Sequence, residues 1–133
     1  MSSSPPIRGT AHVLLVDDEP SILDLLREIL DTEGYTIDTA ENGAVALEKV
    51  LASDFDLIIT DFRMPKLSGK DFYDRAKALK PGIEERFIFI SGEMDPTIKT
   101  RFIEETGVRV IAKPFRSDLV KTTVRQALES FKR

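Results

Sequence analysis

The sequence predicts an α/β domain in which helices cover both faces of an open, doubly wound, five-stranded parallel sheet. Five short apolar runs alternate with longer segments of helical periodicity, and nearly continuous apolar runs are typical of parallel strands buried on both faces. Only a few residues connect each run to the next helical segment, as in a series of β-α units. A length of 133 residues is enough for one domain with its own core.

Each expected strand is brief, apolar and rich in β-branched residues. The five strands are expected at residues 12–16, 36–40, 56–60, 87–90 and 108–111. The first begins at His12, the only histidine of the chain. Because His12 starts its strand, we expect it at the edge of the sheet away from the strand ends that carry ligands, in a structural role.

The five expected helices carry recognisable start signals and apolar stripes. Their starts are marked by Pro20, Asn42, Ser68, Asp95-Pro96 and Ser117, and Gly34 and Gly107 end the first and the fourth. The apolar residues expected to face the sheet are Leu23, Leu26, Ile29, Leu30, Val45, Leu47, Val50, Leu51, Phe72, Ala76, Leu79, Ile98, Phe102, Ile103, Val120, Val124, Ala127, Leu128 and Phe131.

Composition excludes several classes of function. The chain has no cysteine, which excludes disulfides and thiolate metal sites. With 19 Lys and Arg against 23 Asp and Glu, it has no basic surface for nucleic acid. No apolar run approaches the ~20 residues of a membrane span, and the N-terminus has no apolar signal region. We therefore expect a cytoplasmic domain at residues 11–133, behind a flexible leader at residues 1–10, that binds neither membrane nor nucleic acid.

Polar residues with useful chemistry follow four of the five expected strands. They are Asp17-Asp18-Glu19, Asp61, Ser91-Gly92 and Lys113. In an open α/β sheet, ligands bind beyond the carboxyl ends of the strands. We therefore expect carboxylates, a hydroxyl and an ammonium group to meet at one edge of the sheet.

Each of these residues has an ordinary explanation when it is taken alone. An acidic pair such as Asp17-Asp18 is more often turn chemistry and a helix cap, and a lone Lys113 is a solvated charge. Three carboxylates gathered at one edge repel each other, however, and chains tolerate this mainly where a cation compensates. Oxygen ligands without histidine or cysteine nearby select Mg²⁺.

The same group of residues suits the transfer of a phosphoryl group to the protein itself. An aspartate is a nucleophile that forms an aspartyl-phosphate, and Asp61 is the candidate. The Ser91 hydroxyl and the Lys113 ammonium can then hold phosphoryl oxygens beside the metal. Neither G-x-G-x-x-G nor G-x-x-x-x-G-K occurs in the chain, so no nucleotide-binding loop accompanies this group.

Four segments resemble the receiver domains of two-component response regulators. They are residues 13–20 (VLLVDDEP), 56–65 (DLIITDFRMP) with Ser68-Gly69, 89–92 (FISG) and 112–115 (AKPF). The motifs stand in the family order, and the resemblance extends from Ala11 to Arg133. It implies a flavodoxin-like sheet with strand order 2-1-3-4-5.

The resemblance also implies a role for each residue at the strand ends. Asp61 accepts a phosphoryl group from a sensor histidine kinase or a histidine phosphotransfer protein, and the domain acts as a conformational switch rather than an enzyme. Ser91 is the hydroxyl that moves toward the phosphoryl group, and Lys113 is its ammonium partner. The implied Mg²⁺ ligands are Asp17 through water, Asp18, Asp61 and the backbone carbonyl of Arg63.

One position departs from the family pattern. The family usually carries Tyr or Phe three residues before the lysine, as the rotating aromatic residue of the switch, and this chain has Val110 there. The simplest interpretation is that Val110 is a core strand residue. We then expect Ser91 to carry most of the coupling between the phosphoryl group and the surface.

Two other functions are alternatives to a phosphorylated switch. A phosphatase of the haloacid dehalogenase type also uses an aspartate nucleophile and Mg²⁺, but it has a second Asp where this chain has Arg63. A receiver-like module that only binds partners would lack Asp61 or Lys113, and both are present. The sequence leaves open a homodimer, and whether the domain is free-standing or part of a hybrid histidine kinase.

Overall fold

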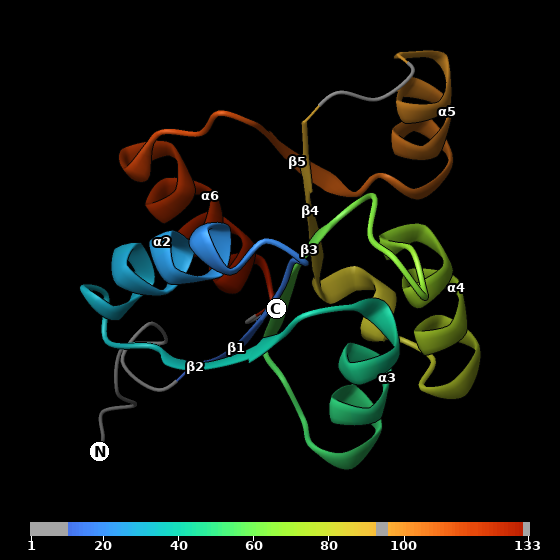
Figure 1. Cartoon of the computed structure of the whole chain (residues 1–133), viewed down its shortest axis with the longest axis horizontal. Coiled ribbons are helices and arrows are strands. Elements are labelled where there is room, and N and C mark those ends of the chain that lie inside the picture. The colour runs from blue at the N-terminus through green and yellow to red at the C-terminus, as the bar shows by residue number, and fades with distance from the viewer. Residues whose placement is uncertain (1–10, 93–95, 132–133) are drawn as a thin grey trace.

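The computed structural model describes residues 11–92 and 96–131 (Figure 1). Five parallel strands form one sheet in the order β2-β1-β3-β4-β5. The predicted fold class and strand order are therefore confirmed. The leader expected at residues 1–10, the helix start at Asp95 and the side chain of Ile98 lie outside the described parts of the chain.

The strands match the expected positions, with a systematic shift at three of their ends. They are β1 (His12–Val16), β2 (Thr36–Ala40), β3 (Leu57–Asp61), β4 (Phe87–Ser91) and β5 (Arg109–Ala112). The last three end one residue later than the sequence predicts, because ladder pairing continues for one more residue. Asp61 pairs with Ile90 and Ser91 pairs with Ala112. Asp61 and Ser91 are therefore held by the sheet and do not begin flexible loops.

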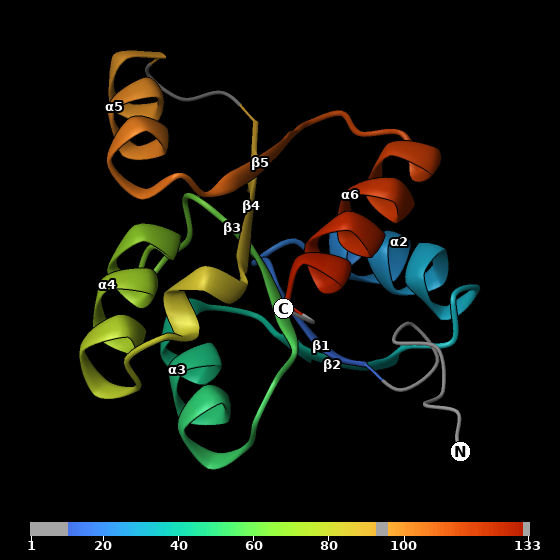
Figure 2. The same cartoon turned by 180° about the vertical axis from the view of Figure 1, so that it is seen from behind.

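Helices cover both faces of the sheet (Figures 1 and 2). One face carries α2 (Pro20–Asp31) and α6 (Ser117–Ser130), and the other carries α3 (Gly43–Ala52), α4 (Gly69–Leu79) and α5 (Pro96–Thr106). A short 3₁₀ helix, η1 (Ile83–Arg86), leads into β4. No helix in the described ranges is long and apolar enough to cross a membrane.

The helix starts follow the predicted capping signals. The side chains of Asn42 and Ser68 each accept a hydrogen bond from the backbone amide three residues later, at 2.9 and 3.1 Å, which satisfies an otherwise unpaired donor. Gly107, with φ of 69°, ends α5 as expected. The expected end of α2 at Gly34 is wrong, because the helix stops at Asp31 and Gly34 belongs to the turn that leads to β2.

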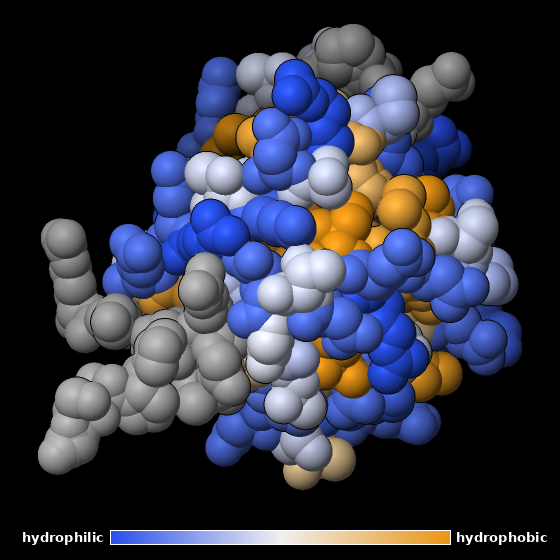
Figure 3. Space-filling model, turned by 90° about the vertical axis from the view of Figure 1, so that its left-hand side faces the viewer, coloured by the Kyte–Doolittle hydropathy of each residue, from blue (hydrophilic) through white to orange (hydrophobic). Residues whose placement is uncertain are grey.

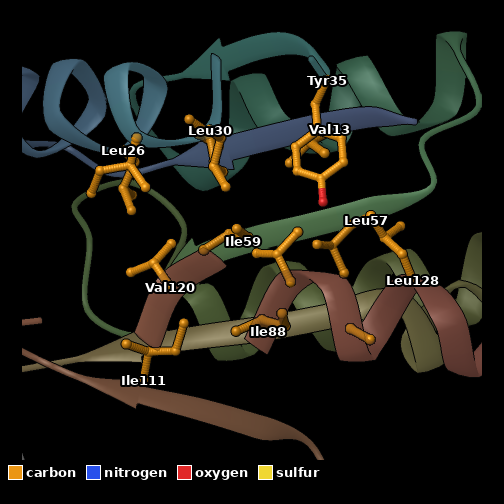
Figure 4. Packing of buried hydrophobic residues seen from close by; sticks show 14 of the residues in the cluster. Val13, Leu26, Leu30, Tyr35, Leu57, Ile59, Ile88, Ile111, Val120 and Leu128 are labelled. Carbon is orange, nitrogen blue, oxygen red and sulfur yellow. The ribbon is translucent and has the colours of Figure 1, made fainter. Parts of the chain in front are cut away.

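Two hydrophobic clusters separate the sheet from its helices. In the cluster of Figure 4, Leu26 and Leu30 of α2 and Val120 of α6 pack against the strand residues. The second cluster lies under α3, α4 and α5 and is rich in aromatic rings. The expectation that Leu51 and Leu79 face the sheet is wrong, because their side chains are 49% and 60% exposed. Both residues lie in the last turn of their helices and face solvent.

The outer surface is mainly hydrophilic on the side that carries α2 and α6, where hydrophobic residues show between polar ones (Figure 3). Leu25 of α2 and Leu119 of α6 are 45% and 50% exposed. Single apolar side chains of this kind are normal on protein surfaces and by themselves identify no binding site.

Candidate functional site

Asp61, Ser91 and Lys113, three of the residues that the sequence places at the strand ends, meet in one shallow pocket of about 200 Å³. Its lining residues are Glu19, Asp61, Phe62, Arg63, Ser91, Gly92 and Lys113. Lys113 reaches into the pocket from the loop after β5, and its Nζ lies 3.3 Å from Asp17 Oδ2 and 3.4 Å from Asp61 Oδ2. One ammonium group is therefore shared between two carboxylates.

A third carboxylate completes an acidic cluster beside Lys113. Asp17, Asp18 and Asp61 each place a carboxylate oxygen within 4.8 Å of the others. Asp17 is fully buried and Asp61 is buried, whereas Asp18 is exposed. The backbone amide of Glu19 donates a 2.9 Å hydrogen bond to Asp17 Oδ1 and orients that side chain. Three carboxylates with one face open to water fit Mg²⁺, which binds carboxylate oxygens and keeps several waters.

Burial makes the two inner carboxylates costly to ionise. Burial raises the pKa of Asp17 to about 6, and the negative charge of Asp61 adds to this, while the Glu19 amide and Lys113 oppose it. Burial likewise raises the pKa of Asp61, against Lys113 and the N–H groups of Phe62 and Arg63. A divalent cation would relieve this cost, because it favours the charged carboxylates.

The pKa of the Lys113 ammonium group is also raised, which favours its charged form. Burial alone would lower the pKa of Lys113, but the carboxylates of Asp61 and Asp17 outweigh burial and raise it. Lys113 is therefore held in its charged form. Glu19 Oε1 lies 3.7 Å from the same Nζ, and its side chain is 59% exposed, so a fourth, solvent-facing carboxylate lies at the mouth of the pocket.

Ser91 lies at the end of β4 with 2% exposure. Its hydroxyl donates a hydrogen bond to the carbonyl of Gly92 at 3.4 Å, which is long for an O–H donor. Since this contact is weak, an oxygen acceptor that enters the pocket can compete for the hydroxyl. Ser91 therefore stands ready to bind such an oxygen.

The start of α4 packs directly against the backbone of Asp61. A Cβ atom on Gly69 would lie only 2.0 Å from the Asp61 carbonyl oxygen. The Gly69 amide also donates a 3.0 Å hydrogen bond to the carbonyl of Phe62. Only glycine permits this approach, so Gly69 determines the position of the acidic strand end.

The structure brings together Asp17, Asp18, Asp61, Ser91 and Lys113, and Arg63 lines the same pocket. The sequence grouped Glu19 with the acidic pair and Gly69 with a family motif, but it predicted no separate role for either residue. Glu19 directly follows the acidic pair, which is a visible signal. The contact of Gly69 with Asp61 had no signal in the spacing of the residues.

His12 and Val110 have the structural roles that the sequence predicts. At the opposite edge of the sheet, His12 Nε2 lies 3.3 Å from Asp38 Oδ2, and its ring is tilted against Phe55 with centroids 4.3 Å apart. Val110 pairs with Phe89 in the sheet and packs, partly buried, against the aromatic cluster. Neither side chain lines the acidic pocket.

Residues 13–125 match the family model of the response regulator receiver domain. The chain is 32% identical over 120 residues to the transcriptional regulatory protein GlrR of Escherichia coli, which covers 90% of this chain and 26% of that protein. It is 31% identical over 116 residues to sporulation initiation phosphotransferase F of Bacillus subtilis, covering 87% and 92%.

A solved structure has the same fold over nearly the whole chain. It is the signal receiver domain of a signal transduction histidine kinase from Syntrophus aciditrophicus, with a TM-score of 0.82 and 28% identity over 92% of this chain and 93% of that one. The match thus spans nearly all of that receiver domain, whereas this chain spans about a quarter of the length of the transcriptional regulator.

Proposed function

This chain belongs to the response regulator receiver domain family of two-component systems, and from that premise we propose that it relays signals by accepting a phosphoryl group on Asp61. One observation carries the choice of acceptor. Asp61 ends a central strand, lines the open pocket and lies 3.4 Å from the Lys113 ammonium. Asp17 is fully buried, and Asp18 does not line this pocket.

The chemistry that we propose is a single phosphoryl transfer. A carboxylate oxygen of Asp61 attacks the phosphorus of a phosphohistidine, an O–P bond forms, and the N–P bond breaks with its electron pair returning to the imidazole. Lys113 neutralises charge that develops on the phosphoryl oxygens, and the Ser91 hydroxyl donates to one of them. Hydrolysis later removes the group, so the domain catalyses only its own phosphorylation and dephosphorylation.

The acidic cluster suits the Mg²⁺ on which receiver domains generally depend. Asp17, Asp18, Asp61 and the backbone carbonyl of Arg63 would hold the ion, with Asp17 acting through water. When bound, Mg²⁺ supplies positive charge that offsets the carboxylates and the incoming phosphoryl group. The raised pKa of Asp17 and Asp61 supports this assignment, because both carboxylates lack sufficient compensation from Lys113 alone.

The donor that we propose is a sensor histidine kinase or a histidine phosphotransfer protein. One relative is named a phosphotransferase, and a structural neighbour is the receiver domain of a histidine kinase. The pocket is shallow and open, which suits a side chain presented by another protein. We propose a cytoplasmic site of action with no direct part for membrane or nucleic acid, in line with a net charge of −4.

Incubation with acetyl phosphate and Mg²⁺ tests the acceptor. We expect a hydroxylamine-labile acyl phosphate on the parent chain and none on Asp61→Asn, which keeps the shape but removes the nucleophile. Asp74→Asn is the matched control, because Asp74 forms an exposed ion pair with Lys70. Undiminished label on Asp61→Asn would contradict the proposal. An unlabelled parent would favour the partner-binding alternative.

A further inference from the structure

In the part of α5 whose side chains the structure describes, one aromatic ring packs into the core. Among the described side chains of α5, Phe102 is the only buried one, with 4% exposure. Its ring packs at steep angles against Phe62, Tyr73 and Phe89, with centroids 5.2, 5.4 and 5.1 Å away. Edge-to-face pairs of this kind contribute about 0.5–1.5 kcal/mol each beyond burial. The position of α5 therefore depends strongly on the rings beneath Phe102.

The rings beneath Phe102 belong to the strands that carry the acceptor site. Phe62 directly follows Asp61, and its backbone amide both supports the Asp61 carboxylate and donates a 3.1 Å hydrogen bond to the carbonyl of Ile90. Phe89 lies on β4 two residues before Ser91. The rings that contact Phe102 are therefore joined through short stretches of backbone to both Asp61 and Ser91.

We propose that the ring contact between Phe62 and Phe102 couples the phosphorylation state of Asp61 to the position of α5. The inference rests on the proposed acceptor function of Asp61. A phosphoryl group draws Lys113 and Ser91 toward new oxygens and alters the hydrogen bonds that the Asp61 carboxylate accepts. The backbone at Phe62 adjusts, its edge-to-face contact with Phe102 changes, and α5 moves because no other described side chain of that helix is buried.

Phe62 and Phe102 are thus positioning residues, and a purely structural role makes a different prediction. If the rings only fill the core, replacing either one lowers stability without altering how α5 responds to phosphorylation. Val110, which pairs with Phe89 next to this cluster, has no aromatic ring to provide a parallel route. A response of α5 that needs both rings therefore distinguishes coupling from packing.

The test compares Phe62→Leu, Phe102→Leu and the double variant with the full-length parent. Amide hydrogen exchange of residues 96–106 is measured with Mg²⁺, before and after addition of beryllium trifluoride, a stable mimic of the phosphoryl group. We expect each single variant to lose most of the change that the parent shows. The double variant should lose no more than either single variant, because both rings act in one contact.

Phe72→Leu is the matched control, because Phe72 is fully buried in the same cluster and its ring packs on Phe87. This variant should keep the response of α5. Acyl phosphate formation is followed in parallel and should stay within about twofold of the parent in Phe102→Leu and Phe72→Leu, whose rings do not line the pocket. Because Phe62 does line the pocket, the response of Phe62→Leu is compared at equal occupancy by beryllium trifluoride. Phe102→Met and Phe62→Leu make the same comparison if Phe102→Leu does not fold.

A full response of α5 in Phe62→Leu or in the Phe102 variants, with normal label on Asp61, overturns the coupling and leaves the acceptor function intact. An equal loss of response in Phe72→Leu overturns it as well, because any damage to the cluster would then suffice. A parent chain that takes no label on Asp61 overturns the proposed function itself.

Discussion

At the scale of single residues, the buried carboxyl group of Asp17 lowers the stability of the metal-free protein at neutral pH. Its carboxyl group is fully buried, and burial raises its pKa from 3.8 to about 6. A carboxyl group whose pKa rises on folding binds its proton more tightly in the native state. Its contribution to stability is therefore fully present below pH 3.8 and is lost as the pH rises through about 6.

Asp17→Asn should remove this loss. Without metal, we expect the variant to be more stable than the parent at pH 7 by up to about 3 kcal/mol, the equivalent of a pKa shift of about two units. The advantage should shrink toward pH 4, because the Asp17 carboxyl is then protonated and as neutral as the amide of Asn. Asn also keeps the acceptor for the Glu19 amide. Urea unfolding from pH 4 to 8 in a chelator measures it, with the exposed Asp24→Asn as control. Equal stability of variant and parent at every pH would show that burial of the Asp17 carboxylate does not destabilise the metal-free protein.

At the scale of elements, the junction between β3 and α4 determines where the acceptor lies. The start of α4 approaches the Asp61 carbonyl so closely that the space for a Cβ atom on Gly69 is already filled by backbone. Backbone cannot rotate away as a side chain does. The helix therefore holds the strand end in place, and the hydrogen bond from Gly69 to Phe62 reinforces it.

Gly69→Ala should consequently displace the end of β3. We expect a loss of about 1–3 kcal/mol in the free energy of unfolding, the usual cost of overpacking, together with slower acyl phosphate formation on Asp61. Gly92→Ala is the control for stability, because its Cβ would meet Lys113 Cδ at an ordinary 3.6 Å. Urea unfolding and labelling with acetyl phosphate measure the two effects. Unchanged stability and labelling would show that α4 can move away from Asp61 without displacing the acceptor.

At the scale of the whole molecule, metal binding and folding are linked. The cluster of Asp17, Asp18 and Asp61 exists only when β1 and β3 are paired, so Mg²⁺ binds the native state and stabilises it by mass action. At a concentration of 100 Kd the gain is about 2.7 kcal/mol. Because the metal must displace protons from the buried carboxylates, its affinity should rise as the pH rises through about 6.

Thermal unfolding with increasing Mg²⁺ tests this linkage. The melting temperature of the parent should rise, more at pH 7.5 than at pH 5.5, because protonation of Asp17 competes with the metal. Asp18→Ala should lose the increase, since it removes the exposed ligand of the cluster. Asp24→Ala is the exposed control and should retain it. A full increase in Asp18→Ala would show that the ion binds elsewhere.

The sequence by itself determined the architecture and the membership of the site. Strand positions, helix caps and the order of the motifs follow from apolar patterns and short-range hydrogen bonds, which depend on neighbours within a few residues. The rule that ligands bind beyond parallel strand ends was then enough to bring Asp61, Ser91 and Lys113 to one edge. These properties are local, or follow from topology, and they agree with the structure except at the end of α2 and at the exposed Leu51 and Leu79.

Only the tertiary structure decided how the residues at that edge differ from one another. Asp17 and Asp18 are adjacent in sequence, yet one is fully buried and the other exposed. The contact of Gly69 with Asp61 and the packing of Phe62 on Phe102 likewise join residues from separate elements. Burial, pKa and ring contacts depend on which atoms surround a group in space, and those atoms come from segments up to 96 residues away, as Lys113 does for Asp17.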